Sequence, residues 1–304
     1  MKTPSSVGDA YDITHNMFLA AIKEPLDITA AFYNGNWRKS LEHAQRDKHS
    51  WVLEGIGFEP GDLVLDIGCG WGPMIEAIND AGGRGIGLTV SEKQATYCQE
   101  KGLEVYLHDW KETSPRNFGI FNGIVSIGAF EHFCSQEERE QSKQEKIYNS
   151  FFKFCYDSVK NHGRLFLQTM TWGNRVPNYP EDFKLNAKKG SDERILGTLF
   201  ALSSWWPPVS KEQIIETARP YFNLVDSNNG REDYIRTFRE WHRRLESSYP
   251  KKLLSNLGIL WTYLTKRDLQ RAIRAGVSML RHHYFREAFI SNILNHERMF
   301  FEKA

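Results

Sequence analysis

The glycine-rich stretch after the apolar run Leu63–Leu65 constrains the fold more than any other part of the chain. The run ends at Asp66, and glycines then recur at positions 68, 70 and 72. This order predicts a buried parallel strand and a turn from that strand into a helix. Glycine is needed where a side chain would keep a ligand away from the backbone. The stretch therefore predicts a nucleotide-type binding turn at the carboxyl edge of a doubly wound sheet.

The position of the acid distinguishes this turn from the dinucleotide fingerprint. Asp66 precedes the first glycine, where its carboxylate can bind the amine or the ribose of a ligand that lies against the glycines. S-adenosylmethionine, which has no pyrophosphate, suits such a site. A plain glycine turn in an α/β core is the alternative, but strand, acid and turn in this order favour the ligand site.

The composition bounds the class of protein. A chain of 304 residues accommodates one large α/β domain with insertions or two small domains. Its formal net charge of +1 creates no field that points to nucleic acid. Met1 to Asp12 lack an apolar signal core and no apolar run approaches a membrane span, so we expect a cytoplasmic protein. The cysteines have no metal or redox spacing, which predicts reduced thiols and no metal site: Cys69, Cys98, Cys134 and Cys155.

Strands and helices alternate from residue 61 onward. Strands are predicted at 63–67, 84–89, 104–108, 123–127, 163–171, 222–226 and 298–301. Helices are predicted at 41–52, 73–80, 92–101 and 210–218. This alternation predicts a mostly parallel sheet with helices on both faces. Ligands bind beyond the carboxyl ends of such strands, which here are Asp66, Thr89, Asp109 and Ile127.

Two later stretches depart from this rhythm. Residues 173–209 contain four prolines and the pair Trp205-Trp206, and a connection of this length predicts a lid. Residues 233–292 are predicted to be mostly helical. Between positions 249 and 287 there are eight lysines or arginines against two acids. We interpret this basic run as a solvated helix face, with an anionic surface or substrate as the alternative.

Further motifs extend the pattern along the chain. They are Gly87-Leu88-Thr89-Val90-Ser91 with Gln94, Ser126-Ile127-Gly128-Ala129-Phe130-Glu131-His132-Phe133, Tyr234-x-Arg236-Thr237 with Trp241, Tyr11-Asp12, and Leu41-Glu42-x-Ala44-Gln45. With these motifs the chain resembles the cyclopropane-fatty-acid synthase and mycolic-acid methyltransferase family over nearly its whole length. The resemblance implies a seven-stranded Rossmann-like methyltransferase fold that binds S-adenosylmethionine. It also implies a helical cap at 1–60 and a methyltransferase domain at 61–304, with a lid insertion at 173–209 and a helical insertion at 233–292.

The resemblance assigns the cofactor-binding residues by motif. They are Asp66, Gly68 and Gly70 at the methionine end, Thr89, Val90 and Gln94 near the ribose, Asp109 and Trp110 beside the adenine, and the backbone of Ile127 facing the sulfonium. Stacking of an aromatic ring on a base gives affinity with few hydrogen bonds, which is why we expect the Trp110 ring against the adenine.

The chemistry that the family implies begins with an alkene acceptor, which takes the methyl group and becomes a carbocation. Glu131 then suits the role of stabilising the positive charge, although a carboxylate that only holds a turn is the alternative. The motif around Tyr234 favours a place in the acceptor pocket, whereas His132 is expected to pack behind the site. Aromatic faces supply further cation stabilisation, and the candidates are Tyr33, Trp172, Trp205 and Tyr234.

The sequence departs from the family at two positions. Cyclopropane-forming members hold a bicarbonate base with a Cys, a His, the Glu and the Tyr. In this chain Ala30 or Ala31 stands at the Cys position and Gln168 at the His position. We therefore expect activity without bicarbonate, with Gln168 still able to donate and accept hydrogen bonds.

Three hypotheses for the function follow. The first is a methyltransferase that adds carbon to an alkene in a lipid or isoprenoid-like small molecule. The second is a methyltransferase that acts on an amine, and the third is a binding protein that has kept the fold without catalysis. We expect no nucleic-acid partner, and both a transient contact with a membrane surface and a homo-oligomer stay open.

Overall fold

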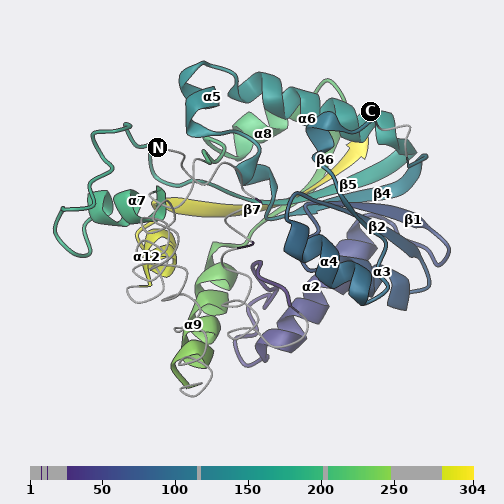
Figure 1. The fold of residues 1–304 in the computed structure, drawn as a ribbon, viewed down its shortest axis with the longest axis horizontal. Helices are drawn as coiled ribbons and strands as arrows, with labels where there is room; N and C mark the ends of the chain where they lie inside the picture. The colour runs from purple at the N-terminus through teal and green to yellow at the C-terminus, as the bar shows by residue number, and fades with distance from the viewer. Residues whose placement is uncertain (1–7, 9–11, 13–25, 115–117, 201–204, 248–282) are drawn as a thin grey trace.

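The chain is built on one seven-stranded sheet with the strand order β3-β2-β1-β4-β5-β7-β6 (Figure 1). The computed structural model describes residues 8, 12, 26–114, 118–200, 205–247 and 283–304. Its strands are β1 (Leu63–Ile67), β2 (Arg84–Thr89), β3 (Val105–Leu107), β4 (Phe121–Ile127), β5 (Val159–Trp172), β6 (Phe222–Asn229) and β7 (Leu294–Lys303). Strands β1 to β5 pair in parallel, and β7 runs antiparallel between β5 and β6. The predicted seven-stranded, mostly parallel fold is confirmed.

Helices cover both faces of this sheet. In Figure 1 α2 (Leu41–Gly55), α3 (Pro73–Asp80) and α4 (Glu92–Glu100) lie on one face, and α5 (Gln136–Glu140), α6 (Gln144–Ser158) and α8 (Lys211–Ala218) lie on the other. Three more helices gather beside one end of the sheet, namely α7 (Asp192–Phe200), α9 (Arg231–Ser247) and α12 (Tyr284–Ile290). Two short 3-10 turns, η1 (Trp110–Glu112) and η3 (Phe130–His132), follow β3 and β4.

Local sequence signals set most of the helix starts. The hydroxyl groups of Ser40, Ser91 and Ser210 each accept a hydrogen bond from a backbone N–H in the first turn of the helix that follows. Pro73 begins α3, where a missing N–H costs little. The first two strands and α3 begin and end at the predicted residues.

The last strand is longer than predicted. Only positions 298–301 were expected to be extended, yet β7 pairs with β5 from Leu294 to Glu302. The residues before position 298 include His296 and Glu297, which are polar but buried. Because a polar run in a sequence normally indicates exposure, hydropathy could not reveal this part of the strand.

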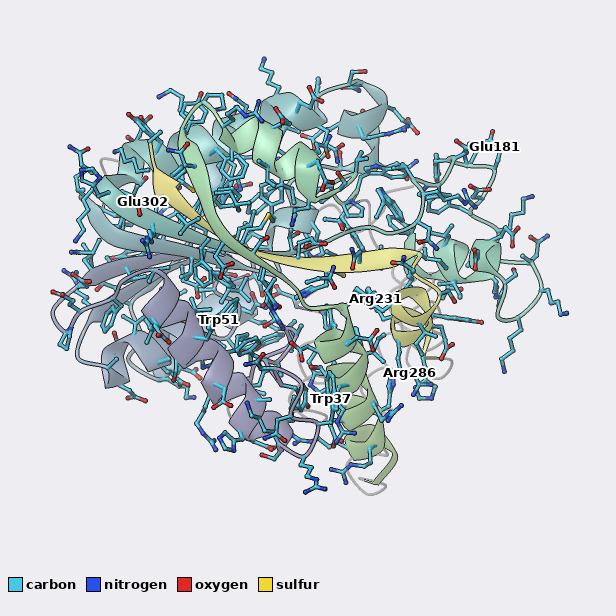
Figure 2. The ribbon with its side chains drawn as sticks, turned by 180° about the vertical axis from the view of Figure 1, so that it is seen from behind. Trp37, Trp51, Glu181, Arg231, Arg286 and Glu302 are labelled. Carbon is cyan, nitrogen blue, oxygen red and sulfur yellow. The ribbon has the colours of Figure 1, made fainter. Side chains whose placement is uncertain are left out.

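The two faces of the sheet bury separate apolar layers. Val64, Val125, Phe166 and Phe300 pack with the apolar sides of α2 and α3. Figure 2 shows Trp51 of α2 beside the sheet, where its ring meets Phe166 and Phe300 edge-on. The alternate strand residues pack against α6 on the other face.

This alternation also decides where the polar residues of the strands lie. Side chains two residues apart on a strand share a face. Asp66 therefore shares the α2 face with Val64, Gln168 with Phe166, and Arg298 with Phe300. Three polar side chains from β1, β5 and β7 thus converge on one face, near the carboxyl ends of β1 and β5.

Near the end of the stretch 173–209, Trp205 and Trp206 contact the segment that precedes α5. The Trp206 N–H donates a 2.8 Å hydrogen bond to the Cys134 carbonyl, and Trp205 bridges to Ser135. Both rings are buried, and Trp206 meets Trp172 edge-on. These contacts support an anchoring role for the pair. The division into cap, lid and helical insertion stays a prediction.

Some expectations fall on other parts of the chain. Nearly all of the basic run, including positions 249–282, and most of the predicted helix start at 11–14 lie outside the described residues. Within the described part, the four cysteines are free thiols, and all four are buried. No helix in that part is both long and apolar enough to cross a membrane.

Candidate active site

The turn after β1 provides a cradle without side chains. Gly68, Gly70 and Gly72 adopt positive φ angles of 82°, 57° and 79°, which L side chains rarely adopt. A Cβ on Gly68 would lie 2.3 Å from the Cβ of Ala129, so the turn packs closely against the segment that follows β4. Beside Gly70, by contrast, the nearest atom to such a Cβ is 4.0 Å away. The backbone is therefore open to a ligand at Gly70.

Asp66 lies buried directly before this cradle. Its side chain is 2% exposed, and its Oδ1 has no hydrogen-bond partner within the described part of the chain. Burial raises the pKa of Asp66 to about 8; the charge of Asp27 adds to the rise and that of Lys48 opposes it. An unpaired, buried carboxyl group beside an open backbone turn fits the amine end of S-adenosylmethionine.

The end of β2 brings the predicted ribose-binding residues together. The Thr89 hydroxyl donates a 2.8 Å hydrogen bond to Gln94 Oε1, which orients the amide nitrogen away from Thr89. That nitrogen is the atom 4.0 Å from the Cβ position of Gly70. Thr89 and Gln94 are buried, whereas Val90 is 43% exposed at the surface. Thr89 and Gln94 thus border the glycine cradle.

The surroundings of Trp110 are largely apolar, and its expected stacking on an adenine stays a prediction. Asp109 accepts a 2.9 Å hydrogen bond from the Lys111 N–H and so begins η1 at the edge of the sheet. The Trp110 ring turns inward and is 7% exposed. It contacts Phe133, Phe151 and Phe154 in the α6-side layer. Trp110 is a core residue, since burying a large ring in an apolar layer is favourable.

Glu131 is held in the turn η3 after β4. The Thr169 hydroxyl donates a 2.8 Å hydrogen bond to Glu131 Oε2, and the carboxyl group is 2% exposed. Burial raises the pKa of Glu131 to about 7, against the hydrogen bonds from its own backbone N–H, from Thr169 and from the backbone of Met170. Its Oε1 lies 3.9 Å from the Cβ position of Gly128. A carboxyl group with a pKa near neutrality suits proton transfer.

Gln168 and Ile127 pair with each other on neighbouring strands, close to the turn that carries Glu131. Ile127 pairs with Gln168 in the β4–β5 ladder, and the Gly128 N–H donates a 2.8 Å hydrogen bond to the Gln168 carbonyl. The Gln168 side chain is fully buried on the α2 face. The site residues predicted at the ends of β4 and β5 are therefore adjacent.

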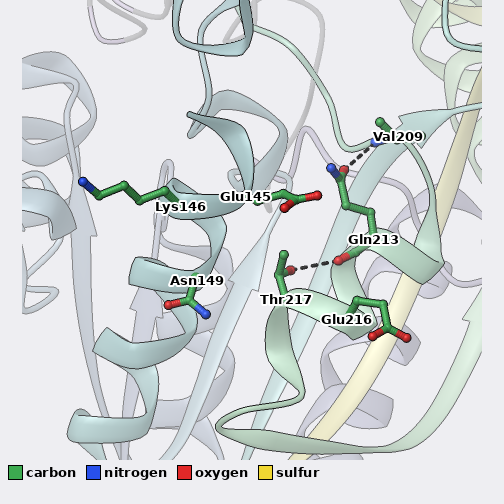
Figure 3. A pocket seen from close by; sticks show the side chains of 7 residues that line it. All are labelled: Glu145, Lys146, Asn149, Val209, Gln213, Glu216 and Thr217. Atoms are coloured by element: carbon green, nitrogen blue, oxygen red, sulfur yellow. Dashed lines mark hydrogen bonds between the residues drawn. The ribbon is translucent and has the colours of Figure 1, made fainter. Parts of the chain in front are cut away.

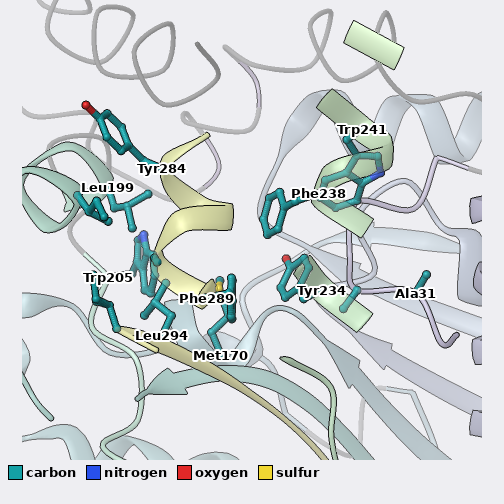
Figure 4. Packing of buried hydrophobic residues seen from close by; sticks show 14 of the residues in the cluster. Ala31, Met170, Leu199, Trp205, Tyr234, Phe238, Trp241, Tyr284, Phe289 and Leu294 are labelled. Atoms are coloured by element: carbon teal, nitrogen blue, oxygen red, sulfur yellow. The ribbon is translucent and has the colours of Figure 1, made fainter. Parts of the chain in front are cut away.

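Tyr234 comes from α9 and faces an aromatic cluster. Figure 4 shows it among Phe238 and Trp241 of α9 and Phe289 of α12. Its ring stacks on Phe238 at 4.6 Å and meets the ring of His296 at 4.9 Å. Ala31 and Met170 belong to the same cluster (Figure 4). The assignment of Ala30 or Ala31 to the family's Cys position stays a prediction.

His132 packs near the site. Its ring meets Trp205 edge-on at 5.4 Å, and burial lowers its pKa to about 4. A neutral ring packed against the tryptophan agrees with the structural role expected for it.

The sequence reasoning placed Ala30, Ala31 and Tyr33 near the site but missed Asp27 and Thr29 of the same segment. Residues 26–33, called the strap below, contain no helix or strand. Asp27 in the strap binds Lys48 Nζ of α2 at 2.5 Å and lies 2.9 Å from His49 Nε2. Burial alone would raise the pKa of Asp27, but the charge of Lys48 and the contact with His49 hold it below its ordinary value.

Thr29 of the strap lies close to Gly128, which follows β4. Its hydroxyl donates to Asp27 Oδ1 and accepts from Lys48 Nζ at 2.6 Å. Its Cγ2 lies 3.1 Å from the Cβ position of Gly128. Acids and lysines in a polar stretch normally indicate a solvated surface, so only the fold could show this buried network.

One surface cavity lies away from these residues. Figure 3 shows it between α6 and α8, lined by residues such as Glu145, Asn149 and Gln213. None of the predicted site residues lines it, so we assign it no role in the chemistry.

Comparisons with known proteins agree with this geometry. A family model described as mycolic acid cyclopropane synthetase matches residues 2–256. Cyclopropane mycolic acid synthase 2 of Mycobacterium leprae is 33% identical over 183 residues, which cover 56% of this chain and 57% of that protein. The S-adenosylmethionine-dependent methyltransferase UmaA of Mycobacterium tuberculosis is 27% identical over 248 residues, covering 78% and 81%. The crystal structure of mycolic acid cyclopropane synthase CmaA1 with SAH and CTAB has a TM-score of 0.74 at 21% identity, covers 99% of both chains and has the same fold.

Proposed function

The chain belongs to the mycolic acid cyclopropane synthetase family of S-adenosylmethionine-dependent methyltransferases, and from this we propose that it methylates an alkene carbon in a lipid or isoprenoid-like small molecule. The observation that carries the proposal is the buried Glu131, held by Thr169 at the ligand edge of the sheet. The family supplies the cofactor and the reaction class, whereas the acceptor is our proposal.

The cofactor fits the residues around the glycine turn. Asp66 is assigned the amine, the backbone at Gly68 and Gly70 the methionine chain, and Thr89 with Gln94 the ribose region. When bound, S-adenosylmethionine supplies an electrophilic methyl group. The open space at Gly70 and the unpaired Asp66 oxygen support this placement.

Glu131 is assigned the role of stabilising the positive charge that develops on the acceptor. Addition of a methyl group to one alkene carbon leaves positive charge on the other. An ionised carboxylate in a buried site stabilises such a charge more strongly than one in water. The ring of Tyr234, in the aromatic cluster of α9 and α12, is assigned a second role in stabilising this charge.

The same carboxylate completes the reaction by removing a proton. Loss of a proton from carbon to Glu131 returns the C–H electron pair to the product, as a new double bond or a ring bond. A pKa of about 7 places the carboxyl group between its two forms at neutral pH, which suits this transfer. We therefore infer that no bicarbonate is needed, in keeping with Ala30, Ala31 and Gln168.

Labelled methyl transfer tests this function. The purified protein is incubated with S-adenosylmethionine carrying a labelled methyl group and with unsaturated phospholipid vesicles, isoprenoid alcohols and a panel of amines. Mass spectrometry then locates the label. We expect it on carbon, in the absence of bicarbonate, with activity lost in Glu131→Gln and retained in Glu140→Gln, whose side chain is exposed on α5. Label found only on nitrogen would instead establish an amine methyltransferase.

A further inference from the structure

The Gln168 amide has a fixed orientation. Arg298 Nε donates a 3.2 Å hydrogen bond to Gln168 Oε1, and both side chains are fully buried. A guanidinium group has donors but no acceptor, so only the amide oxygen can face it. The amide nitrogen must therefore point away from Arg298.

Arg298 is itself held by three other elements. Its Nη1 donates to Asp233 Oδ2 of α9 at 2.6 Å and to Asn228 Oδ1 of β6 at 3.2 Å. Its Nη2 donates to the carbonyl of Ala31 in the strap at 2.7 Å. A guanidinium bound on four sides cannot rotate without breaking several buried hydrogen bonds. Arg298 thus acts as a rigid support for the Gln168 amide.

The nitrogen of this amide is left without a partner. Gln168 Nε2 is buried and makes no hydrogen bond to any residue that the structure describes. Two rungs away on the neighbouring strand, opposite Met170, His296 Nδ1 is also buried without a described partner. A buried donor without an acceptor is costly, so such groups usually have an unseen partner.

The place of Gln168 indicates what that partner is. On one side of β5 the amide is flanked by β4, with Gly128 and Glu131. On the other side lies β7, where Arg298 pairs with Gln168 and where His296, two residues before Arg298, contacts the ring of Tyr234. The strand of Gln168 therefore lies between β4, which is followed by Glu131, and β7, which contacts Tyr234, and these are the two residues that the proposed function places at the acceptor.

We propose that Gln168 is a specificity residue, positioned by Arg298, whose nitrogen donates a hydrogen bond to an oxygen atom that the methyl acceptor carries close to its reacting double bond. The acceptor class is then an oxygenated unsaturated lipid, with a hydroxyl or carbonyl group a few bonds from the alkene. A plain hydrocarbon chain would leave the donor unpaired. This inference rests on the proposed function and extends it.

Two lipid probes test the inference. Oleate and ricinoleate have the same chain and double bond, and ricinoleate adds one hydroxyl near that bond. Binding of each to protein saturated with S-adenosylhomocysteine is measured by calorimetry. We expect wild type to bind ricinoleate about tenfold more tightly, the effect of one buried hydrogen bond. Gln168→Met should remove this preference and leave the affinity for S-adenosylhomocysteine within about twofold.

A matched variant separates loss of the donor from disturbance of Arg298. Asn228→Ala removes another acceptor of the same guanidinium but keeps the Gln168 amide, so it should retain the preference for ricinoleate. The Gln168 side-chain amide signal, assigned in nitrogen-15 spectra by its absence in Gln168→Met, should shift with ricinoleate and stay in place with oleate.

Three outcomes would overturn the inference. One is equal affinity of wild type for the two probes, including no binding of either. Another is a Gln168 signal that responds to bicarbonate alone, which would assign the oxygen to a small anion. The third is a loss of S-adenosylhomocysteine binding in Gln168→Met at unchanged thermal stability, which would assign the amide to the cofactor. A wild type that does not bind S-adenosylhomocysteine would refute the proposed function itself.

Discussion

The Thr169 hydroxyl donates a 2.8 Å hydrogen bond to Oε2 of Glu131, and both residues are buried at the carboxyl edge of the sheet. A hydrogen bond to a carboxylate favours its ionised form, whereas burial favours the neutral form. The balance leaves the pKa of Glu131 at about 7. The hydroxyl of Thr169 therefore helps to decide how much of the enzyme carries an ionised Glu131 at neutral pH.

Removing that hydroxyl should shift the pH dependence of methyl transfer. The rate should rise with pH as Glu131 ionises, with a midpoint near 7 in wild type. In Thr169→Val we expect this midpoint about one pH unit higher, because a donor to the charged form is lost. Thr171→Val is the control, since Thr171 is buried on the same strand and its hydroxyl donates to the neighbouring Trp172 carbonyl. Equal midpoints in the two variants would show that Thr169 does not tune Glu131.

The buried Glu131 should also lower the free energy of unfolding as the pH rises. Its ordinary pKa of 4.5 applies to the unfolded chain, and the folded protein keeps the proton up to about pH 7. Between these values the folded state binds more protons, so stability falls as pH rises. Glu131→Gln should match wild type below about pH 4.5 and exceed it by roughly 3 kcal/mol above pH 7. Urea unfolding at several pH values measures the difference, and a constant gap across the range would contradict the prediction.

Binding of S-adenosylhomocysteine should release a proton from Asp66. At pH 7 a carboxyl group with a pKa of about 8 is mostly protonated. An ammonium group placed beside it lowers that pKa and drives the proton off. Calorimetry in buffers of different ionisation enthalpy should therefore detect close to one released proton in wild type and none in Asp66→Asn. If wild type releases no proton, Asp66 does not bind the amine, and the ribose hydroxyls become its expected partner.

The open space at Gly70 gives a test of the cofactor cradle. Gly70→Val should abolish binding of S-adenosylhomocysteine, because the side chain would fill the space where the ligand meets the backbone. Gly102→Val is a matched control, since Gly102 also has a positive φ and open surroundings but follows the far end of α4. Both variants bear similar backbone strain, so only the loss of ligand space separates them. Retained affinity in Gly70→Val would refute the cradle.

The tryptophan pair should matter for stability rather than for cofactor affinity. Trp206 is fully buried and is tied through its backbone to Cys134 and Gln144. Trp206→Ala should lower the free energy of unfolding by about 3 kcal/mol or more, the usual cost of removing a large buried ring. Trp37→Ala, at a ring that is 46% exposed, should cost much less. Unchanged stability in Trp206→Ala would contradict the anchoring role and would favour a lid over the acceptor.

Local patterns in the sequence were enough to predict the frame of the site. The apolar run before Asp66, the glycine turn and the serine caps each depend on only a few neighbouring residues. The strand, the turn and the helix starts that they form can therefore be predicted from the local sequence. Parallel strands then carry Asp66, Thr89 and Ile127 to one edge wherever the intervening helices lie. Glu131 was found for the same reason, because its motif follows the end of a predicted strand.

What the tertiary structure decided was which polar groups are buried and what they face. Arg298 and Gln168 are 130 positions apart and meet only because β7 inserts antiparallel beside β5. From the sequence alone, Asp27 and Lys48 would be taken for surface charges. In the structure they form a buried ion pair between the strap and α2. The packing of the Trp110 ring in the α6 layer is likewise visible only in the fold. In each case the burial of a side chain depends on elements distant in the chain, and local sequence carries no information on that.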